Sequence, residues 1–358
     1  MSKKRDSRLL IIHRAQFGYH TDVYKWCEYL KDVYMVSTIT FDDRRPKVKL
    51  DGVENYYVSC VRNKLVRGVC FIVYAFIRIL FFNGKIIVCY FPKCQVLGRV
   101  FNKKRIAVDF RTMSVMPDEF VRQRENAAMK ETALAYPHVF AISEGVARQL
   151  LTDISRVSIV SLGADIICES DKLFDRIHLL YVGTFEYRHL ERTITGLRLA
   201  MDAGLNSQHV TYDIVGDGRY GEADQLKSML SAMELDSIVK LHGYIQHCGL
   251  KEFYEKCNVG VSFVPMIECF EFQPVTKTFE YALSGLYTIA TRTFANQQVI
   301  KDVNGILIDD TPEEFARALL RLSGMSNEIH SNEIRSSMKD YTWRSIVDNQ
   351  LKPALDKL

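Results

Sequence analysis

Short apolar runs that alternate with longer amphipathic stretches constrain the fold of this chain more than any other feature. In the first half, the apolar runs are typical of buried strands, and helical patterns lie between them. The expected strands are Arg8–His13, Tyr34–Phe41, Asn55–Cys60, Lys85–Tyr90, Arg105–Phe110 and Val139–Ile142. The expected helices are Thr21–Lys31, Leu65–Phe82, Gln95–Asn102, Asp118–Ala135 and the capped segment Ser143–Leu151.

The alternation starts again after a polar, irregular segment between Gly163 and Asp175. The second series of expected strands is Ile177–Val182, Val210–Val215, Ile238–Leu241, Val259–Val264, Tyr287–Thr291 and the run NGILIDD at residues 304–310. Its expected helices are Leu190–Ala203, Glu222–Met233, Leu250–Cys257, one that begins near Pro274, and one that begins at Pro312.

Strands that alternate with helices form a parallel sheet covered by helices on both faces. Two such series in 358 residues predict two Rossmann-like, doubly wound α/β domains. We expect the first at residues 1–165 and the second at 166–341, with a closing helix at 342–358 that packs back onto the first. Doubly wound sheets bind ligands beyond the carboxyl ends of their strands, so we expect the two domains to face a crevice.

The two halves differ in charge. Residues 1–165 hold 27 Lys and Arg against 16 Asp and Glu, whereas the remainder holds 20 against 27. Between Asn55 and Val108 no acidic residue occurs, and the basic residues are Arg62, Lys64, Arg67, Arg78, Lys85, Lys93, Arg99, Lys103, Lys104 and Arg105. This pattern indicates an anionic surface or substrate for the first domain, although chance clustering on a solvated face also fits.

Several features bear on the compartment of the protein. Nine scattered cysteines without a C-x-x-C pair are typical of reduced cytosolic thiols. The basic N-terminus is followed by an apolar run of only Leu9–Ile12, which is too short for a secretory signal. The aromatic residues of the basic half lie in apolar runs and are not interleaved with its cations, so we expect no nucleic acid as a partner.

The stretch Leu65–Phe82 is the most apolar of the chain, and two arginines interrupt it. On a helix, Lys64, Arg67, Tyr74 and Arg78 fall on one narrow stripe, which a membrane span would not carry cheaply. A helix with one edge at an anionic membrane surface and an ordinary crossover helix with a polar edge both fit. We expect peripheral attachment to the inner face of the cytoplasmic membrane through the first domain.

The segment FQPVTKTFEYALSGLYTIAT, residues 272–291, combines features of an anion site. Pro274 favours the start of a helix, whose free N–H groups attract anions, and Lys277 adds a positive charge there. Glu280, one turn later, can accept two hydrogen bonds from a ribose diol. Together these groups suit a nucleotide, but a surface Lys–Glu pair three residues apart has the same spacing.

The neighbouring motifs carry a family resemblance. The segment resembles the signature of the family 4 glycosyltransferases (glycosyl transferases group 1), which are retaining GT-B enzymes, with a P-x-x-K-x-x-E-Y helix before a G-x-x-x-I-A-T strand. LLYVGTFEYRHLERTI, YDIVGDG, VKLHGYI, NGILIDDTPEEFARAL and YTWRSIVDNQL resemble further family motifs in the same order. In the first half, VDFRT, FAISEGVARQL and VSLGAD are similar as well.

The resemblance implies a set of donor-binding residues. It places the donor diphosphate against Arg188 and Lys277, with Thr184 where the family often has an arginine, and the ribose against Glu280. The remaining candidates come from four features of the family. They are Gly18 in the reduced glycine-rich first loop, Gly216 and Gly218 in a glycine turn, Gly243 and Tyr244 in the base pocket, and Thr276 and Thr278 at the helix start.

Two catalytic residues are also implied by the resemblance. Arg111 stands where the family often has a histidine near the donor sugar. The family's first glutamate would fall at Phe272, and the adjacent Glu271 is the candidate to replace it.

The resemblance implies a retaining hexosyltransferase that moves a sugar from a nucleotide diphosphate sugar to a glycan acceptor in bacterial polysaccharide assembly, with a lipid-pyrophosphate-linked acceptor. No D-x-D or H-E-x-x-H pattern occurs, so we expect metal-independent chemistry and no cofactor. A GT-B sugar-nucleotide epimerase and a non-catalytic, nucleotide-sugar-binding partner subunit are the rival interpretations.

Overall fold

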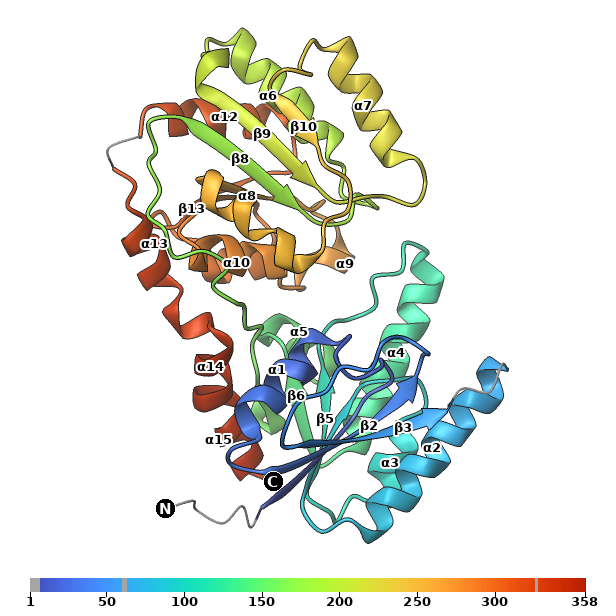
Figure 1. Ribbon diagram of the computed structural model, residues 1–358. Coiled ribbons are helices and arrows are strands. Elements are labelled where there is room, and N and C mark those ends of the chain that lie inside the picture. The colour runs from blue at the N-terminus through green and yellow to red at the C-terminus, as the bar shows by residue number, and fades with distance from the viewer. Residues whose placement is uncertain (1–6, 60–62, 326–327) are drawn as a thin grey trace. The chain divides into compact units, whose positions relative to one another are not determined.

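A computed structural model describes residues 7–59, 63–325 and 328–358 (Figure 1). The chain forms two compact units. Unit 1 holds Met1–Gly163 and Trp343–Leu358, and unit 2 holds Ala164–Thr342.

Unit 1 is built on a parallel sheet with the strand order β3-β2-β1-β4-β5-β6-β7. Its strands are β1 (Arg8–Ile12), β2 (Met35–Asp42), β3 (Val53–Ser59), β4 (Lys85–Cys89), β5 (Ile106–Phe110), β6 (His138–Ala141) and β7 (Val157–Ile159). The chain moves outward in one direction from β1 and in the other from β4, which is the doubly wound arrangement that the sequence predicts.

Several helices of unit 1 begin at a residue whose side chain caps them. Its main helices are α1 (Thr21–Leu30), α2 (Lys64–Phe81), α3 (Gln95–Val100), α4 (Glu119–Ala135), α5 (Glu144–Leu150), α14 (Trp343–Ile346) and α15 (Lys352–Asp356). Asn63, Asp118 and Ser143 each accept hydrogen bonds from first-turn N–H groups of the helix that follows. The closing segment packs against α1, where the Arg344 guanidinium lies 5.1 Å from the ring centroid of Tyr29.

Unit 2 repeats this architecture with the strand order β10-β9-β8-β11-β12-β13. Its strands are β8 (Ile177–Val182), β9 (Val210–Val215), β10 (Val239–Leu241), β11 (Val259–Ser262), β12 (Tyr287–Thr291) and β13 (Gly305–Ile308). Its helices are α6 (Glu191–Asp202), α7 (Glu222–Ala232), α8 (Lys251–Lys256), α9 (Glu268–Glu271), α10 (Thr276–Leu283), α11 (Phe294–Val299), α12 (Pro312–Ser323) and α13 (Ser331–Ser337). Figure 1 shows α6, α7 and α12 on one side of this sheet and α8 and α10 on the other.

The structure adds elements that the sequence patterns do not predict. The three-residue edge strand β7 and the short helices α9, α11 and α13 are too brief or too polar to produce a clear period. Most predicted ends shift by one or two residues, and the expected end of the third strand at Cys60 lies outside the described residues.

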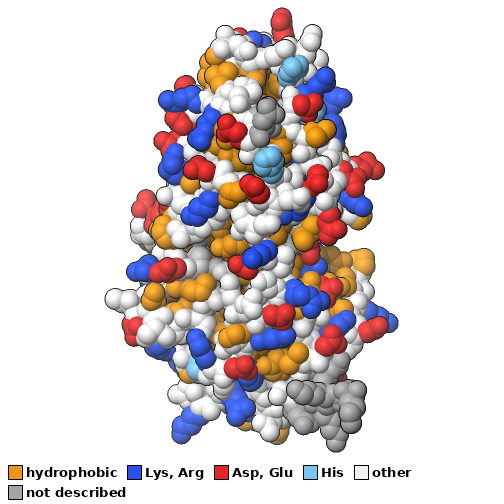
Figure 2. Space-filling model, turned by 90° about the vertical axis from the view of Figure 1, so that its left-hand side faces the viewer, with side chains coloured by type: hydrophobic (Ala, Val, Ile, Leu, Met, Phe, Trp, Pro, Cys, Tyr) orange, Lys and Arg blue, Asp and Glu red, His pale blue; other side chains and the backbone are white. Residues whose placement is uncertain are grey.

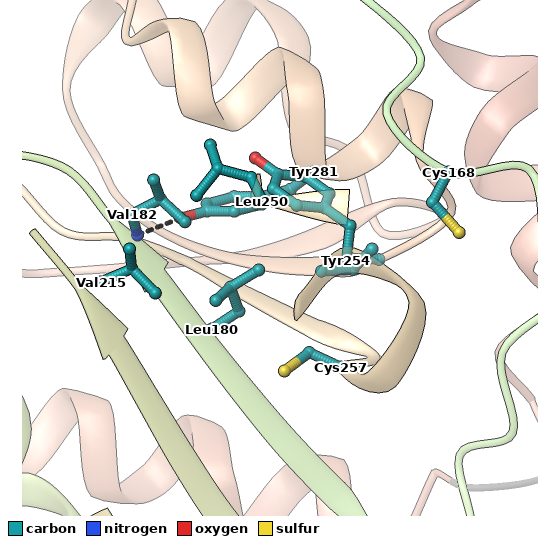
Figure 3. Close-up of a cluster of buried hydrophobic side chains, with 9 residues drawn as sticks. Cys168, Leu180, Val182, Val215, Leu250, Tyr254, Cys257 and Tyr281 are labelled. Carbon is teal, nitrogen blue, oxygen red and sulfur yellow. Dashed lines mark hydrogen bonds between the residues drawn. The ribbon is translucent and has the colours of Figure 1, made fainter. Parts of the chain in front are cut away.

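A cluster of buried side chains lies beneath the carboxyl ends of β8 and β9 (Figure 3). The Tyr281 hydroxyl accepts a hydrogen bond of 2.8 Å from the Val182 backbone N–H, at the end of β8. Its ring lies directly against Gly260 of β11, where an added Cβ would come within 2.3 Å of the ring. The absence of a side chain at Gly260 therefore lets Tyr281 fix the end of β8.

Candidate functional site

Two adjoining cavities open at the carboxyl ends of the unit 2 strands. The first, of about 270 Å³, is lined by the ends of β8 and β11, by Phe270 and by the start of α10. The second, of about 380 Å³, is lined by the ends of β8 and β9 and by the loop after β10. Val182, Gly183, Thr184 and Lys277 line both. The first cavity lies where the strand order of unit 2 reverses, between β8 and β11, and doubly wound sheets bind ligands at such a point.

Gly216 keeps the junction between β8 and β9 open. Its φ is +149°, and an added Cβ would lie 1.8 Å from the carbonyl oxygen of Gly183. Its N–H donates to the carbonyl of Gly243 at 2.9 Å. A residue with a side chain cannot occupy this position without displacing the β8 turn, so glycine here preserves the wall of the second cavity.

Arg188 reaches the first cavity from a strained turn. The residues on either side, Tyr187 and His189, have φ values of 57° and 53°, which side-chain-bearing residues seldom adopt. The guanidinium lies 4.4 Å from the ring centroid of Phe270. Its Nη1 is buried and has no hydrogen-bond partner among the described residues. A buried, unpaired guanidinium nitrogen in a cavity wall is suited to an anion.

The start of α10 forms another wall of the first cavity. The sequence predicts a helix start around Val275 to Thr278, and α10 begins at Thr276. Its N-cap, Val275, offers no side-chain hydrogen bond, so the first N–H groups of the helix have no side-chain cap. Thr276 and Lys277 line the cavity at this point.

Glu280 lies below Lys277 and is only 6% exposed. Its Oε2 accepts hydrogen bonds from the Lys277 amine and, at 3.2 Å, from the Tyr254 hydroxyl. Burial, together with the charge of Glu280, raises the pKa of Tyr254 well above its usual value, which keeps the hydroxyl as a donor. Glu280 Oε1 lies 3.9 Å from Nε2 of His247, a residue that lines the second cavity.

The predicted donor-binding residues of unit 2 divide into two groups. Thr184, Arg188, Gly216, Tyr244, Thr276 and Lys277 line one or both cavities. Gly218, Gly243, Thr278 and Glu280 are not among the lining residues. Thr278 is fully buried, with its hydroxyl 2.6 Å from the Ser262 hydroxyl and 3.2 Å from Asn296 Oδ1. The structure thus places Thr278 in the core.

The structure gives Glu271 a partner outside the cavities. Its Oε1 accepts the Phe294 N–H at 2.7 Å, at the start of α11, and residue 271 does not line the first cavity. The carboxylate therefore caps a helix in this structure, and the expected contact with a sugar stays a prediction.

Gly18 and Arg111 lie in unit 1. Gly18 has a φ of +91°, and an added Cβ would meet Val48 at 2.5 Å. The Arg111 guanidinium donates to Asp22 and to the carbonyl of Val160, both at 2.6 Å, and its side chain is 11% exposed. Arg111 is thus held by its own unit, and a contact with a donor sugar stays a prediction.

Sequence reasoning missed several cavity-lining residues. Phe270 and Gln273 line the first cavity, and Asp217 and His247 line the second. Asp217 lies between the two glycines of the predicted turn, so its place beside the site could have been inferred. His247 and Phe270 follow irregular loops, and no periodic signal marks them.

The described part of the chain contains no group of three or more His, Cys, Asp or Glu side chains placed to hold a metal ion. The charged groups that the site offers are the Arg188 guanidinium, the Lys277–Glu280 pair and the first turn of α10. This arrangement can hold a phosphorylated ligand beside a group that accepts hydrogen bonds.

Residues 176–324 match the family model described as "Glycosyl transferases group 1". That glycosyl transferases group 1 match covers both cavities, from β8 to the end of α12. No curated protein matches the sequence.

Solved structures match nearly the whole chain. The Anabaena protein Alr3699/HepE, solved with UDP, is 12% identical, with a TM-score of 0.76 over 98% of this chain and 100% of that chain. Sucrose-phosphate synthase from Thermosynechococcus elongatus is 16% identical, with a TM-score of 0.73 over 98% and 99%. The lipopolysaccharide outer core galactosyltransferase WaaB is 15% identical, with a TM-score of 0.71 over 98% and 100%. The fold is GT-B, as the sequence predicts.

Proposed function

We propose that this protein is a retaining glycosyltransferase of family 4 that transfers a sugar from a nucleotide diphosphate sugar to a glycan acceptor. The observation that carries the proposal is the buried Nη1 of Arg188, which has no partner among the described residues and lies in the cavity that Lys277 and the first turn of α10 also line. These cations and N–H groups suit a diphosphate, and the adjoining cavity, with Tyr244 and His247 in its wall, has room for a nucleoside.

The donor that we propose to test first is a UDP-sugar. The Anabaena protein that shares this fold is solved with UDP and also with UDP-glucose. In this chain the diphosphate would contact Arg188 and Lys277, and the ribose would contact Glu280. The Lys277–Glu280 pair places the phosphate and ribose contacts within one helical turn of each other.

The proposed chemistry needs no metal. When the sugar leaves, negative charge grows on the departing nucleoside diphosphate, and fixed positive groups stabilise this charge without reorganisation. Arg188, Lys277 and the N-terminus of α10 provide such groups on one cavity wall. Turnover in the presence of EDTA tests metal independence, and the anomeric configuration of the product tests retention.

We further propose a lipid-pyrophosphate-linked acceptor in the assembly of a bacterial surface polysaccharide, with the enzyme at the inner face of the cytoplasmic membrane. The similar galactosyltransferase WaaB acts on the lipopolysaccharide outer core, as its description states. The basic excess of residues 1–165 also fits an anionic acceptor.

Calorimetric titration with UDP tests the donor site. Lys277→Ala should weaken UDP binding by about 10- to 100-fold, because hydrogen bonds to charged groups contribute about 1.5–3 kcal/mol. Lys227→Ala, an exposed lysine on α7, is the matched control and should bind UDP normally. Unchanged UDP affinity in Lys277→Ala would remove Lys277 from the site.

Two further measurements separate the ribose contact and the rival functions. A UDP analogue without ribose hydroxyls should bind the parent more weakly than UDP does. In Glu280→Ala, which has already lost the ribose contact, the analogue and UDP should bind with nearly equal affinity. If the loss from the variant and the loss from the analogue simply add, Glu280 does not contact the ribose.

Incubation with a panel of nucleotide sugars and acceptors should release the nucleoside diphosphate. Interconversion of free nucleotide sugars would point to an epimerase instead, and binding without turnover would point to a partner subunit.

A further inference from the structure

Over its described side chains, helix α2 turns an apolar side toward solvent. Its described side chains that are exposed are Leu65, Val66, Val69, Cys70, Val73, Ile77, Leu80 and Phe81. Leu65 and Phe81, near the two ends, are 82% and 81% exposed, and Val73 in the middle is 51% exposed. A helix at a water-facing surface normally presents polar side chains there, so this face is suited to a docking surface.

The described charged side chains of α2, Arg67 and Arg78, point the other way. The Arg67 guanidinium pairs with Asp43 and lies 3.9 Å from the ring centroid of Phe41, and Arg78 lies 3.7 Å from the centroid of Tyr56. Arg67 and Arg78 of the expected basic stripe therefore pack against strands β2 and β3, and a contact of this stripe with lipid stays a prediction. Arg62 and the side chain of Lys64 lie outside what the structure describes.

The apolar area is larger than α2 alone. Val96 and Val100 of the adjacent helix α3 are 43% and 53% exposed, and the rings of Phe76 and Phe101 join the two helices at 4.9 Å. Figure 2 shows a different face of the molecule, on which acidic and basic side chains are interspersed. A surface of mixed charge needs no partner, whereas a continuous apolar area indicates one.

We propose that the α2–α3 apolar face docks onto the surface of an anionic phospholipid bilayer. The helix would lie in the plane of the interface with Val73 and Ile77 toward the acyl chains. Among the described residues, no helix has the length and apolar composition required to cross a membrane. This inference concerns unit 1 and does not depend on the donor site in unit 2.

The charges around the face favour an anionic bilayer over a second copy of the chain. Lys104 donates to the carbonyls of Leu80 and Phe82, which places the exposed Lys103 and Arg105 beside the end of α2. Of the nearby acidic side chains, Asp43 and Glu131 are paired with Arg67 and Arg99, and Glu54 lines a surface cavity together with Arg78. Two copies that met at this face would bring like charges together, whereas anionic lipid neutralises them.

Vesicle sedimentation of the full-length protein provides the first test. The parent should sediment with phosphatidylcholine vesicles that contain phosphatidylglycerol, less with pure phosphatidylcholine, and less again at high salt. Val73→Glu/Ile77→Glu should weaken binding roughly 30-fold, because both half-exposed side chains lose their contact with lipid. The matched control is Leu173→Glu, at an 80% exposed leucine of unit 2, and it should bind like the parent.

A probe on Cys70 tests whether the helix itself meets the lipid. Cys70 and Cys248 are both exposed thiols, the first on α2 and the second in unit 2. In a chain with Cys60, Cys248 and Cys269 changed to serine, an environment-sensitive dye on Cys70 should shift to the blue with anionic vesicles. A lipid-buried quencher should also reach it. The same dye on Cys248, in the chain with Cys60, Cys70 and Cys269 changed to serine, should not respond.

The outcomes separate the possible occupants. No binding to anionic vesicles at low salt, or equal binding by the glutamate variant, would overturn the proposal. A parent that sediments as a dimer in solution, and becomes monomeric in the glutamate variant without ever binding vesicles, would assign the face to a second copy. UDP titration of the glutamate variant should match that of the parent, so a failure of membrane docking is distinguishable from a failure of the donor site.

Discussion

Each unit holds an arginine near the carboxyl ends of its strands, and the two arginines differ in their partners. In unit 1, Arg111 donates to Asp22 and to the carbonyl of Val160, and its Nη1 lies 3.7 Å from Asp109. In unit 2, Arg188 stacks on Phe270 and has a buried Nη1 without a partner among the described residues. A cation at a strand end is therefore not evidence of a ligand site until its hydrogen bonds are counted.

The two guanidinium groups also differ in their effect on the stability of their units. Arg111 pairs with the Asp22 carboxylate and donates to the carbonyl of Val160, so its charge stabilises the fold. Arg188 is held in a turn with two positive φ values and leaves a donor unsatisfied, an arrangement that costs free energy unless a ligand completes it.

Arg111→Ala should destabilise unit 1 by about 3–5 kcal/mol, because it leaves the buried Asp22 carboxylate without its cation. Both tryptophans, Trp26 and Trp343, are buried in unit 1, so urea unfolding followed by their fluorescence reports on this unit. Arg188→Ala is the control and should leave the transition unchanged. An Arg111→Ala protein of normal stability that binds UDP but turns over no donor would reverse the assignment and support the catalytic role implied by the family resemblance.

Asp109→Asn should change how the stability of unit 1 depends on pH. Burial raises the pKa of Asp109 to about 7, although Arg111 opposes the shift. The folded state therefore keeps a proton that the unfolded chain releases near pH 4, and the parent loses stability as pH rises from about 4 to about 7. The asparagine variant has no such proton, so its advantage should grow by up to about 1.4 kcal/mol per pH unit in this window.

Paired unfolding curves of Asp109→Asn and parent at pH 5 and pH 8, read by tryptophan fluorescence, measure this change. Subtraction of the two proteins removes the other titrating groups that they share. An advantage that is equal at both values would show that Asp109 is already ionised at pH 5 in the folded state.

Arg188→Ala should weaken UDP binding by about 1.5–3 kcal/mol, since the variant loses hydrogen bonds to a charged group, while unit 1 unfolds as in the parent. Arg188→Lys should recover part of the affinity, because it restores the charge but not the planar pair of donors. Calorimetry with UDP and with uridine separates the contributions. Equal losses for both ligands would move Arg188 from the phosphates to the nucleoside or to a purely structural role.

Much of the fold follows from local sequence patterns. The bounds of β8, β9 and β12 are those that the apolar runs predict, and α10 begins where Pro274 and the polar turn indicate. These features depend on residues that are neighbours in sequence, so periodicity and turn chemistry are sufficient to find them.

The candidate site is less predictable, because its details depend on distant partners. Arg111 is satisfied by carbonyls about 50 residues away, and Thr278 is bound by Ser262 and Asn296 in the core. The family resemblance places residue types near a ligand but cannot show which side chains the fold has already paired. Hydrogen-bond partners in the folded structure supply that distinction.

The smallest predicted effect concerns Glu271, which the family resemblance places near the reaction and the structure places at the start of α11. Its Oε1 accepts the Phe294 N–H at 2.7 Å, and loss of such a cap costs about 1 kcal/mol. If capping is its whole role, Glu271→Gln, whose side chain keeps an oxygen acceptor, should retain stability and turnover. Glu271→Ala should then lose about 1 kcal/mol of unit 2 stability, measured by hydrogen exchange at the α11 amides, and keep most of its turnover.

If the carboxylate instead contacts the sugar or the reacting centre, both variants should lose kcat by a similar and larger factor, with UDP affinity unchanged. A kcat loss in Glu271→Gln, without a change in α11 exchange, would therefore move Glu271 from a cap to a residue that acts on the substrate.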